Sequence, residues 1–199
     1  CWDQPELRGH IQRDQRILRP INMAETEPGL GVKDFQVGAV RISVIQAMGR
    51  VFMPEGLDNP FKAIDGALNA GRHIAAGQIT LVDFHAEATS ETAALAHYLD
   101  GRVTSVTGTH THVPTADARV FPGGTAFQTD LGMCGDYHSV IGSKAEGLFP
   151  FYLDERPSMR FGVAMGEPTL CGVVLDCDIN SGCALAIEPL RVGGVLSQT

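Results

Sequence analysis

Three histidines follow two apolar, β-branched runs, and their spacing suits metal binding. His85 follows the run 79–84, and His110 and His112 follow the run 103–107. Open α/β sheets bind ligands at the carboxyl ends of their strands, so both runs should deliver side chains to one crevice. Residues i and i+2 of an extended segment point to the same side. We therefore expect His110 and His112 to face one point, with His85 joining them, and to bind a transition metal through neutral imidazole nitrogens.

Carboxylates accompany these histidines. Asp83 would share a face with His85 and is expected to orient its imidazole, because a ligating histidine usually donates its second N–H to a carboxylate or carbonyl. A strand aspartate satisfied by backbone donors is the alternative for Asp83. Glu87 and Asp130 are expected to contact a metal-ligating histidine or the substrate, or to lie on the surface. The other four histidines have helical or loop contexts that favour solvated or capping roles: His10, His73, His97 and His138.

Cys134 suggests a different chemistry, since a thiolate on a glycine-rich turn becomes a nucleophile when a histidine lies within hydrogen-bond reach. No known thiol-hydrolase spacing surrounds it, so a Cys134 hydrolase is the weaker alternative. Cys171, Cys177 and Cys183 are expected to be small apolar residues. The five cysteines include no C-x-x-C pair, which predicts neither a disulfide framework nor a cysteine zinc site and favours a reducing cytoplasm.

The composition narrows the class of protein. A chain of 199 residues with 44% hydrophobic and 19% charged residues suits one domain with a real core. The net charge of −8 argues against binding long nucleic acid, and a phosphate-bearing substrate would need a local cation such as a bound metal. No apolar run reaches the roughly 18 residues that span a bilayer. The chain begins at Cys1 without a leading strand, so we expect it to be cut inside a domain.

Apolar periodicity predicts the elements that position the histidines. The strand 79–84, a helix over 91–99 capped by Thr89 or Ser90, and the strand 103–107 form a strand–helix–strand unit, which is typical of a parallel pair with a crossover. The remaining predictions are a helix over 2–15, one or two strands over 35–47 turning at Gly38, a helix over 61–70, a turn at 122–124 between 118–121 and the strand 125–129, an irregular loop over 130–142, a helical then looped segment over 144–157, and a closing hairpin of 170–176 and 183–191.

The longest informative stretches are VDFHAEATSE and DGRVTSVTGTHTHVPTADARVFPGGTAFQTDLGMCGDYHSVIG. They closely resemble the YmdB-like branch of the calcineurin-like metallophosphoesterases. The segments CWDQPEL, LRPIN, MGRVFM and DNPF resemble the same branch, so the resemblance covers nearly the whole chain.

The resemblance implies an α/β (α+β) fold, a two-sheet sandwich flanked by helices. It also implies two divalent metal ions, iron or manganese with zinc as the alternative, and cleavage of small phosphodiesters such as 2′,3′- or 3′,5′-cyclic nucleotides. His85 and His110 match the ligands of one metal, and His112 matches a ligand of the other. Trp2 and Asp3 match the tail of the family's Gly-Asn-His-x-Trp-Asp motif.

By the same resemblance, the oxygen ligands and the histidine that assists the chemistry would precede Cys1. We therefore expect residues 1–199 to be a single domain that is incomplete at its amino terminus, lacks its first strands and helices, and has impaired activity. No membrane partner is expected. The alternative from another class is a signalling or scaffold protein, acting through an oligomer surface, with a vestigial metal site.

Overall fold

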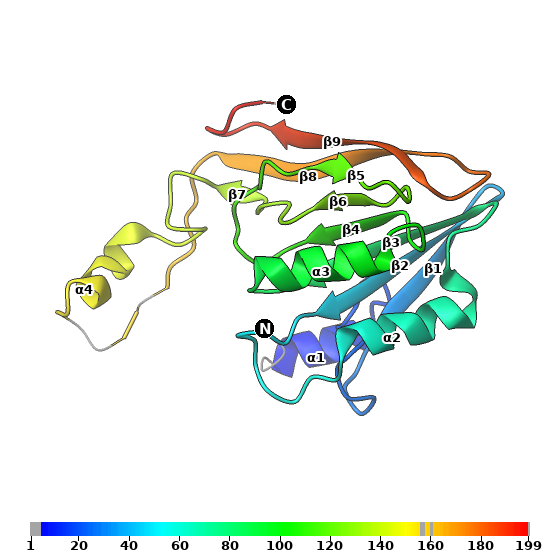
Figure 1. Ribbon diagram of the computed structural model, residues 1–199. Coiled ribbons are helices and arrows are strands. Elements are labelled where there is room, and N and C mark those ends of the chain that lie inside the picture. Colours follow the sequence, from blue (N-terminus) through cyan, green and yellow to red (C-terminus); the bar gives the residue numbers. More distant parts are fainter. Residues whose placement is uncertain (1–4, 156–157, 160, 199) are drawn as a thin grey trace.

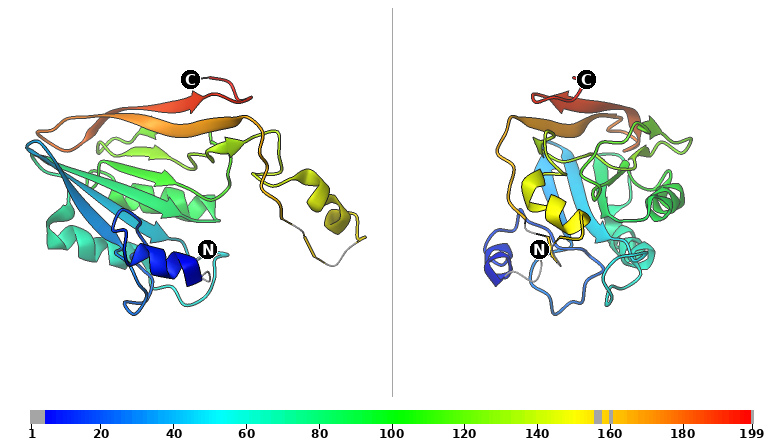
Figure 2. Two further views of the ribbon diagram at one scale, coloured as in Figure 1. Left: turned by 180° about the vertical axis from the view of Figure 1, so that it is seen from behind. Right: turned by 90° about the vertical axis from the view of Figure 1, so that its left-hand side faces the viewer.

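The computed structural model describes residues 5–155, 158–159 and 161–198, which form two β-sheets with the longer helices beside the larger one, while the segment 145–155 projects away from both sheets (Figures 1 and 2). The helices are α1 (Pro5–Ile11), α2 (Pro60–Ala67), η1 (Leu68–Arg72), α3 (Thr89–Leu99), η2 (Ala145–Gly147) and α4 (Phe149–Tyr152). The strands are β1 (Val32–Val37), β2 (Val40–Met48), β3 (Gln78–His85), β4 (Ser105–Gly108), β5 (Arg119–Val120), β6 (Ala126–Gln128), β7 (Gly135–Asp136), β8 (Pro168–Cys177) and β9 (Ala184–Val192).

The larger sheet has six strands in the order β1-β2-β3-β4-β6-β5. Strands β2, β3, β4 and β6 are parallel, whereas β1 and β5 run antiparallel to their neighbours. The predicted crossover from β3 through α3 to β4 is confirmed. Because these strands are parallel, the residues that follow β3 and β4 reach the same edge of the sheet.

The core lies between this sheet and the helices α2 and α3, which cover one face (Figure 2). Alternate residues of β3, Val82 and Phe84, point into it, and Leu95 and Leu99 of α3 pack from the other side. All four side chains are at most 1% exposed. Complete burial of one such side chain contributes about 1.5–3 kcal/mol, so this packing fixes where β3 ends.

The smaller sheet has the order β7-β8-β9, and β8 and β9 form the predicted closing hairpin. Strand β9 contacts β5 and β6. The hairpin therefore lies along the β5 edge of the larger sheet (Figure 1). The two-sheet arrangement expected from the sequence is therefore confirmed. Strand β7 was not predicted, because its two residues lie within the stretch 130–142, which lacks periodicity.

Several predicted boundaries are wrong. The helix predicted over 2–15 ends at Ile11, and residues 1–4 lie outside the described part. The segment over 144–157 agrees with its prediction of a helical and then looped course, since η2 and α4 are followed by turn residues, and residues 156–157 lie outside the described part. Helix α3 begins at Thr89, and its N-cap is Ala88, which makes no side-chain cap bond. In the described ranges no helix is long and apolar enough to cross a membrane.

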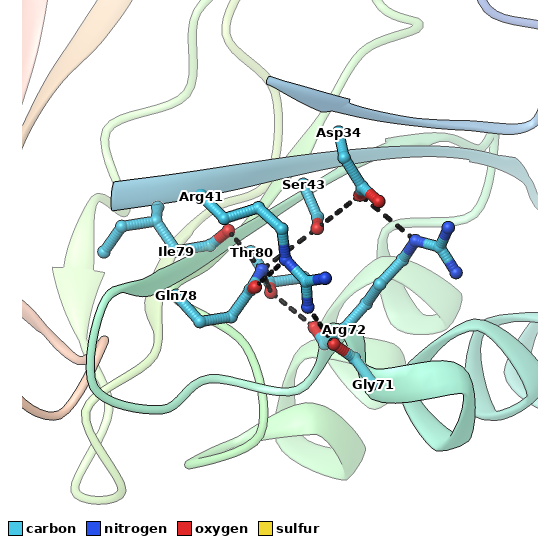
Figure 3. Close-up of polar contacts among 8 residues, drawn as sticks. All are labelled: Asp34, Arg41, Ser43, Gly71, Arg72, Gln78, Ile79 and Thr80. Atoms are coloured by element: carbon cyan, nitrogen blue, oxygen red, sulfur yellow. Dashed lines mark hydrogen bonds and ion pairs between the residues drawn. The ribbon is translucent and has the colours of Figure 1, made fainter. Parts of the chain in front are cut away.

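A polar network joins β1, β2 and β3 at the amino ends of β2 and β3 (Figure 3). Buried Gln78 accepts a hydrogen bond from the Arg41 guanidinium and donates one to Ser43 Oγ at 3.0 Å. Ser43 Oγ donates to Asp34 at 2.7 Å, and Arg72 of η1 donates to the same carboxylate at 3.1 Å. These partners satisfy one another, which is what a structural clamp requires.

Candidate metal site

The histidines that follow β3 and β4 meet at the predicted edge. His85 is the last residue of β3, and His110 follows β4 by two residues. Nε2 of His85 lies 3.0 Å from Nδ1 of His110, with the two rings inclined at 76°. The neighbourhood predicted for this pair is confirmed.

Hydrogen bonds to the other ring nitrogens indicate where each imidazole carries its proton. Nε2 of His110 bonds the carboxylate of Glu87, so it is the donor in that pair. Nδ1 of His85 lies 3.5 Å from Thr109 Oγ1, which donates its own proton to Asp83 at 2.9 Å. A metal bound at Nε2 of His85 would require the tautomer with its proton on Nδ1, where Thr109 Oγ1 is the neighbouring acceptor. Asp83 consequently reaches His85 through Thr109, rather than directly.

Across the 3.0 Å gap the two nitrogens either share a proton in an N–H···N hydrogen bond or, with that proton removed, present two lone pairs to one cation. Two nitrogens bound to one metal at about 2.1 Å and at right angles are about 3.0 Å apart. The donor set of imidazoles with carboxylates behind them is that of a transition-metal site. The side chains present therefore fit a divalent metal ion held by His85 and His110.

Burial shifts the pKa values of two of these groups, His85 and Asp83. Burial, and then the charge of neighbouring His110, lowers the pKa of His85, so its imidazole is neutral near pH 7 as ligation requires. Burial also raises the pKa of Asp83, an effect that the bond from Thr109 opposes and the nearby charge of Asp130 reinforces.

His112 does not follow the prediction for an extended segment. Strand β4 ends at Gly108, and His112 has a left-handed backbone with φ 66°. Its Nδ1 donates to the carbonyl of Ile141 at 2.9 Å, which leaves Nε2 as its free ligating atom. The i, i+2 argument was therefore wrong for His110 and His112, because the chain turns between them. Among the described residues, no three His, Cys, Asp or Glu side chains form a ready metal cage.

Asp130 positions the turn that carries the histidines. It is 2% exposed, and Oδ2 accepts the backbone N–H groups of His110 at 2.8 Å and Thr111 at 2.7 Å. Its Oδ1 accepts the N–H of Gly132 at 2.8 Å. Asp130 is thus neither a surface residue nor directly bonded to an imidazole. It fixes the backbone from which His110 projects.

Close packing also constrains the end of β4. A Cβ added at Gly108 would overlap the carbonyl oxygen of Thr129, so only glycine allows the strand to approach the segment that bears Asp130. Sequence reasoning missed this role, because a glycine between Thr107 and Thr109 carries no local signal of what it packs against.

The alternative site at Cys134 lacks a base. The thiol is exposed and donates to the Cys171 carbonyl at 3.5 Å, and no histidine of the described residues hydrogen-bonds to it. His97 stacks on Phe121 instead, and His73 contacts the carbonyl of Leu68.

A cavity of about 580 Å³ opens beside the histidine pair. Its lining combines His85 and His110 with apolar side chains from two segments outside the sheet, Met23, Phe52, Met53 and Leu57 among them. No sequence pattern predicted this cavity, because its walls come from segments that are brought together only by the fold.

The comparison with protein families matches residues 1–190 to the model described as YmdB-like protein. A relative from Bacillus subtilis, named 2′,3′-cyclic-nucleotide 2′-phosphodiesterase, is 41% identical over 192 residues, which cover 96% of this chain and 71% of the relative. The chain therefore belongs to the YmdB-like family.

Solved structures agree. A hypothetical protein from Thermus thermophilus superposes with a TM-score of 0.85 at 39% identity, over 98% of this chain and 74% of that one. A protein described as a novel phosphatase from Mycoplasma pneumoniae also gives 0.85, at 32% identity, over 96% of this chain and 69% of that one. Membership of this metallophosphoesterase-type family implies use of divalent metal ions.

Proposed function

We propose that this protein is a metal-dependent phosphodiesterase that hydrolyses small phosphodiesters, with 2′,3′-cyclic nucleotides as the first candidates and 3′,5′-cyclic nucleotides as the second. The phosphoesterase class rests on the family and on the names of the relatives from Bacillus subtilis and Mycoplasma pneumoniae. The free thiols and the nucleotide substrate suit the cytoplasm.

The observation that carries the proposal is the 3.0 Å approach of Nε2 of His85 to Nδ1 of His110 at the carboxyl ends of two parallel strands. A divalent cation bound there would polarise the phosphoryl group and lower the pKa of an attacking water. Two carboxylates orient His110: Glu87 fixes its tautomer by accepting the Nε2 proton, and Asp130 fixes its backbone. Mixed imidazole and carboxylate ligation favours iron or manganese, with zinc as the alternative.

We further propose that the centre is dinuclear and that His112 serves the second ion. Its Nδ1–H is already bonded to the carbonyl of Ile141, so the free Nε2 is presented in one orientation. A dinuclear centre also needs oxygen ligands in addition to these imidazoles. Metal binding by residues 1–199 is therefore the primary measurement, and turnover is the second.

The experiment compares the wild-type chain with His110→Ala and with the matched control His97→Gln, which alters a histidine at the far end of α3. Metal content is measured by elemental analysis after loading with Mn²⁺, and hydrolysis of 2′,3′-cyclic AMP is measured on the same samples. We expect His110→Ala to lose metal and turnover together, while His97→Gln keeps both. Hydrolysis that survives both His110→Ala and chelation would refute the proposal.

A scaffold with a vestigial site makes a different prediction. Such a protein would bind metal stoichiometrically, hydrolyse none of a panel of cyclic nucleotides even after its amino terminus is extended, and sediment as a homo-oligomer.

A further inference from the structure

The cavity beside the histidines is mostly apolar and rich in sulfur. Three of the six methionines of the chain line it, Met23, Met48 and Met53, together with Phe52 and Leu57. A phosphodiester whose phosphate reached His85 and His110 would have to place the rest of the molecule against this wall. Its volume of about 580 Å³ lies in the range of small-molecule sites.

Phe52, Met53 and Leu57 of this wall belong to the loop that joins β2 to α2 (Figure 1), and one buried residue fixes both ends of that loop. Asn22 is 1% exposed, and its Nδ2 donates to the carbonyls of Met48 at 2.8 Å and Asp58 at 2.9 Å. Its Oδ1 accepts the N–H of Met48 at 3.0 Å. These hydrogen bonds therefore hold the two ends of the loop together in the absence of a ligand.

A second contact ties the first arm of the loop to α3. The carboxylate of Glu91 accepts the backbone N–H groups of Arg50 and Val51, each at 3.0 Å. A Cβ at Gly49 would lie 2.6 Å from Glu91 Oε2 and 2.7 Å from the Cβ of Ala86, the residue after His85. Only glycine allows this approach, so the arm is held directly against the metal-binding segment.

Phe52, in the same arm of the loop, has a disfavoured backbone conformation and an exposed ring. Its φ is 60°, a left-handed conformation that is an outlier for a bulky residue, and its side chain is 87% exposed. Strained residues persist where the surroundings hold them, and they cluster at ligand clamps. Packing against the described part of the chain compensates neither the strain nor the exposure of the ring.

We propose that this cavity binds the nucleobase of the substrate, with Phe52 stacking on the base and the methionines packing around it. The inference rests on the proposed function, since it specifies what the phosphodiester carries. Stacking of a base on an aromatic ring is tolerant of base identity, because every base offers a π-face. The protein should therefore require a base and discriminate little among the four.

Binding can be tested without turnover through the methionine methyl groups. The chain labelled with [¹³C-methyl]methionine is titrated with adenosine 3′-monophosphate and, separately, with ribose 5-phosphate. We expect ring-current shifts at Met23, Met48 and Met53 with the nucleotide only. The remaining three methionines, Met133, Met159 and Met165, do not line the cavity and are internal controls. Shifts confined to those controls, or equal shifts with both ligands, would overturn the proposal.

Variants at Phe52 test the stacking itself. Phe52→Ala should weaken nucleotide binding about five- to hundredfold, whereas Phe52→Tyr keeps an aromatic face and should stay within about twofold. Phe161→Ala is the matched control, because Phe161 is an exposed phenylalanine that does not line this cavity. Unchanged affinity in Phe52→Ala contradicts the proposal, as does an equal loss in Phe161→Ala.

Turnover distinguishes this inference from the proposed function. The metal-loaded protein is assayed on 2′,3′-cyclic AMP and on methyl riboside 2′,3′-cyclic phosphate, which has no base. Phe52→Ala should lower kcat/KM for the first and not for the second. An equal effect on both substrates refutes base binding and leaves the phosphodiesterase intact. Absence of any hydrolysis, even after the amino terminus is extended, refutes the phosphodiesterase, while the methyl shifts still decide base binding.

Discussion

Nε2 of His85 lies 3.0 Å from Nδ1 of His110, where two neighbouring parallel strands end. The relationship arises because β3 and β4 are parallel neighbours, with Phe84 opposite Gly108 in the register. Parallel pairing thus places at one point two histidines that are 25 residues apart.

Glu87 is expected to tune the metal affinity through His110. Replacing it with alanine removes the acceptor for the Nε2 proton, and loss of such outer partners typically costs about 10–100-fold in metal affinity. Glu87→Gln retains an acceptor oxygen and should lose less. Competition with a chelating dye measures the affinity, and Glu146→Ala, an exposed carboxylate of η2, is the control. Equal affinities for Glu87→Ala and wild type would remove Glu87 from the site.

Asp130→Asn should destabilise the fold by about 1–3 kcal/mol, because an amide can accept from only one of its two terminal atoms and a buried donor loses its partner. Urea denaturation gives the free energy of unfolding. Asp176→Asn changes an exposed strand carboxylate and should stay within about 0.5 kcal/mol of wild type. If Asp130→Asn also stays within about 0.5 kcal/mol of wild type, its three backbone hydrogen bonds do not stabilise the turn.

Gly108→Ala tests the close approach of β4 to Thr129. The new methyl group would overlap a backbone carbonyl, which cannot swing aside like a side chain, so we expect a loss of about 3 kcal/mol or more. Gly66→Ala lies inside α2 with open space around it and should instead stabilise the protein by about 0.5–1 kcal/mol. Thermal unfolding of the two variants should therefore shift in opposite directions, and a shared direction would contradict the packing argument.

Asp34 gives stability a defined pH dependence. Burial would raise the pKa of its carboxyl, but hydrogen bonds from Ser43 and Arg72 and the charge of Arg72 hold it below its usual range. A carboxyl with a lowered pKa in the folded state contributes stability above its unfolded value, near about 3.9, and loses that contribution as the pH falls through the folded pKa. The gap in unfolding free energy between wild type and Asp34→Asn should thus be constant above about pH 5 and shrink below about pH 4. Arg72→Gln should reduce this difference in unfolding free energy. A difference that grows as the pH falls would refute a lowered pKa for Asp34.

The sequence predicted the β3–α3–β4 unit because apolar runs and turn residues are local signals, and the histidines followed from the ends of those runs. It failed for His112 because the turn after Gly108 depends on Asp130, which lies beyond β6 in the chain. The cavity escaped prediction for the same reason, since Asn22 and Glu91 shape it from distant segments.

The short stretch from His85 to Glu91 joins the proposed metal site to the wall of the cavity, because it carries the proposed ligand His85 at one end and Glu91, which binds the loop, at the other. If occupying the cavity immobilises this stretch, the ordering cost of metal binding is already met, and the two ligands bind cooperatively. Thermodynamic linkage then requires the coupling to be reciprocal: the factor by which a nucleotide tightens the metal must equal the factor by which the metal tightens the nucleotide.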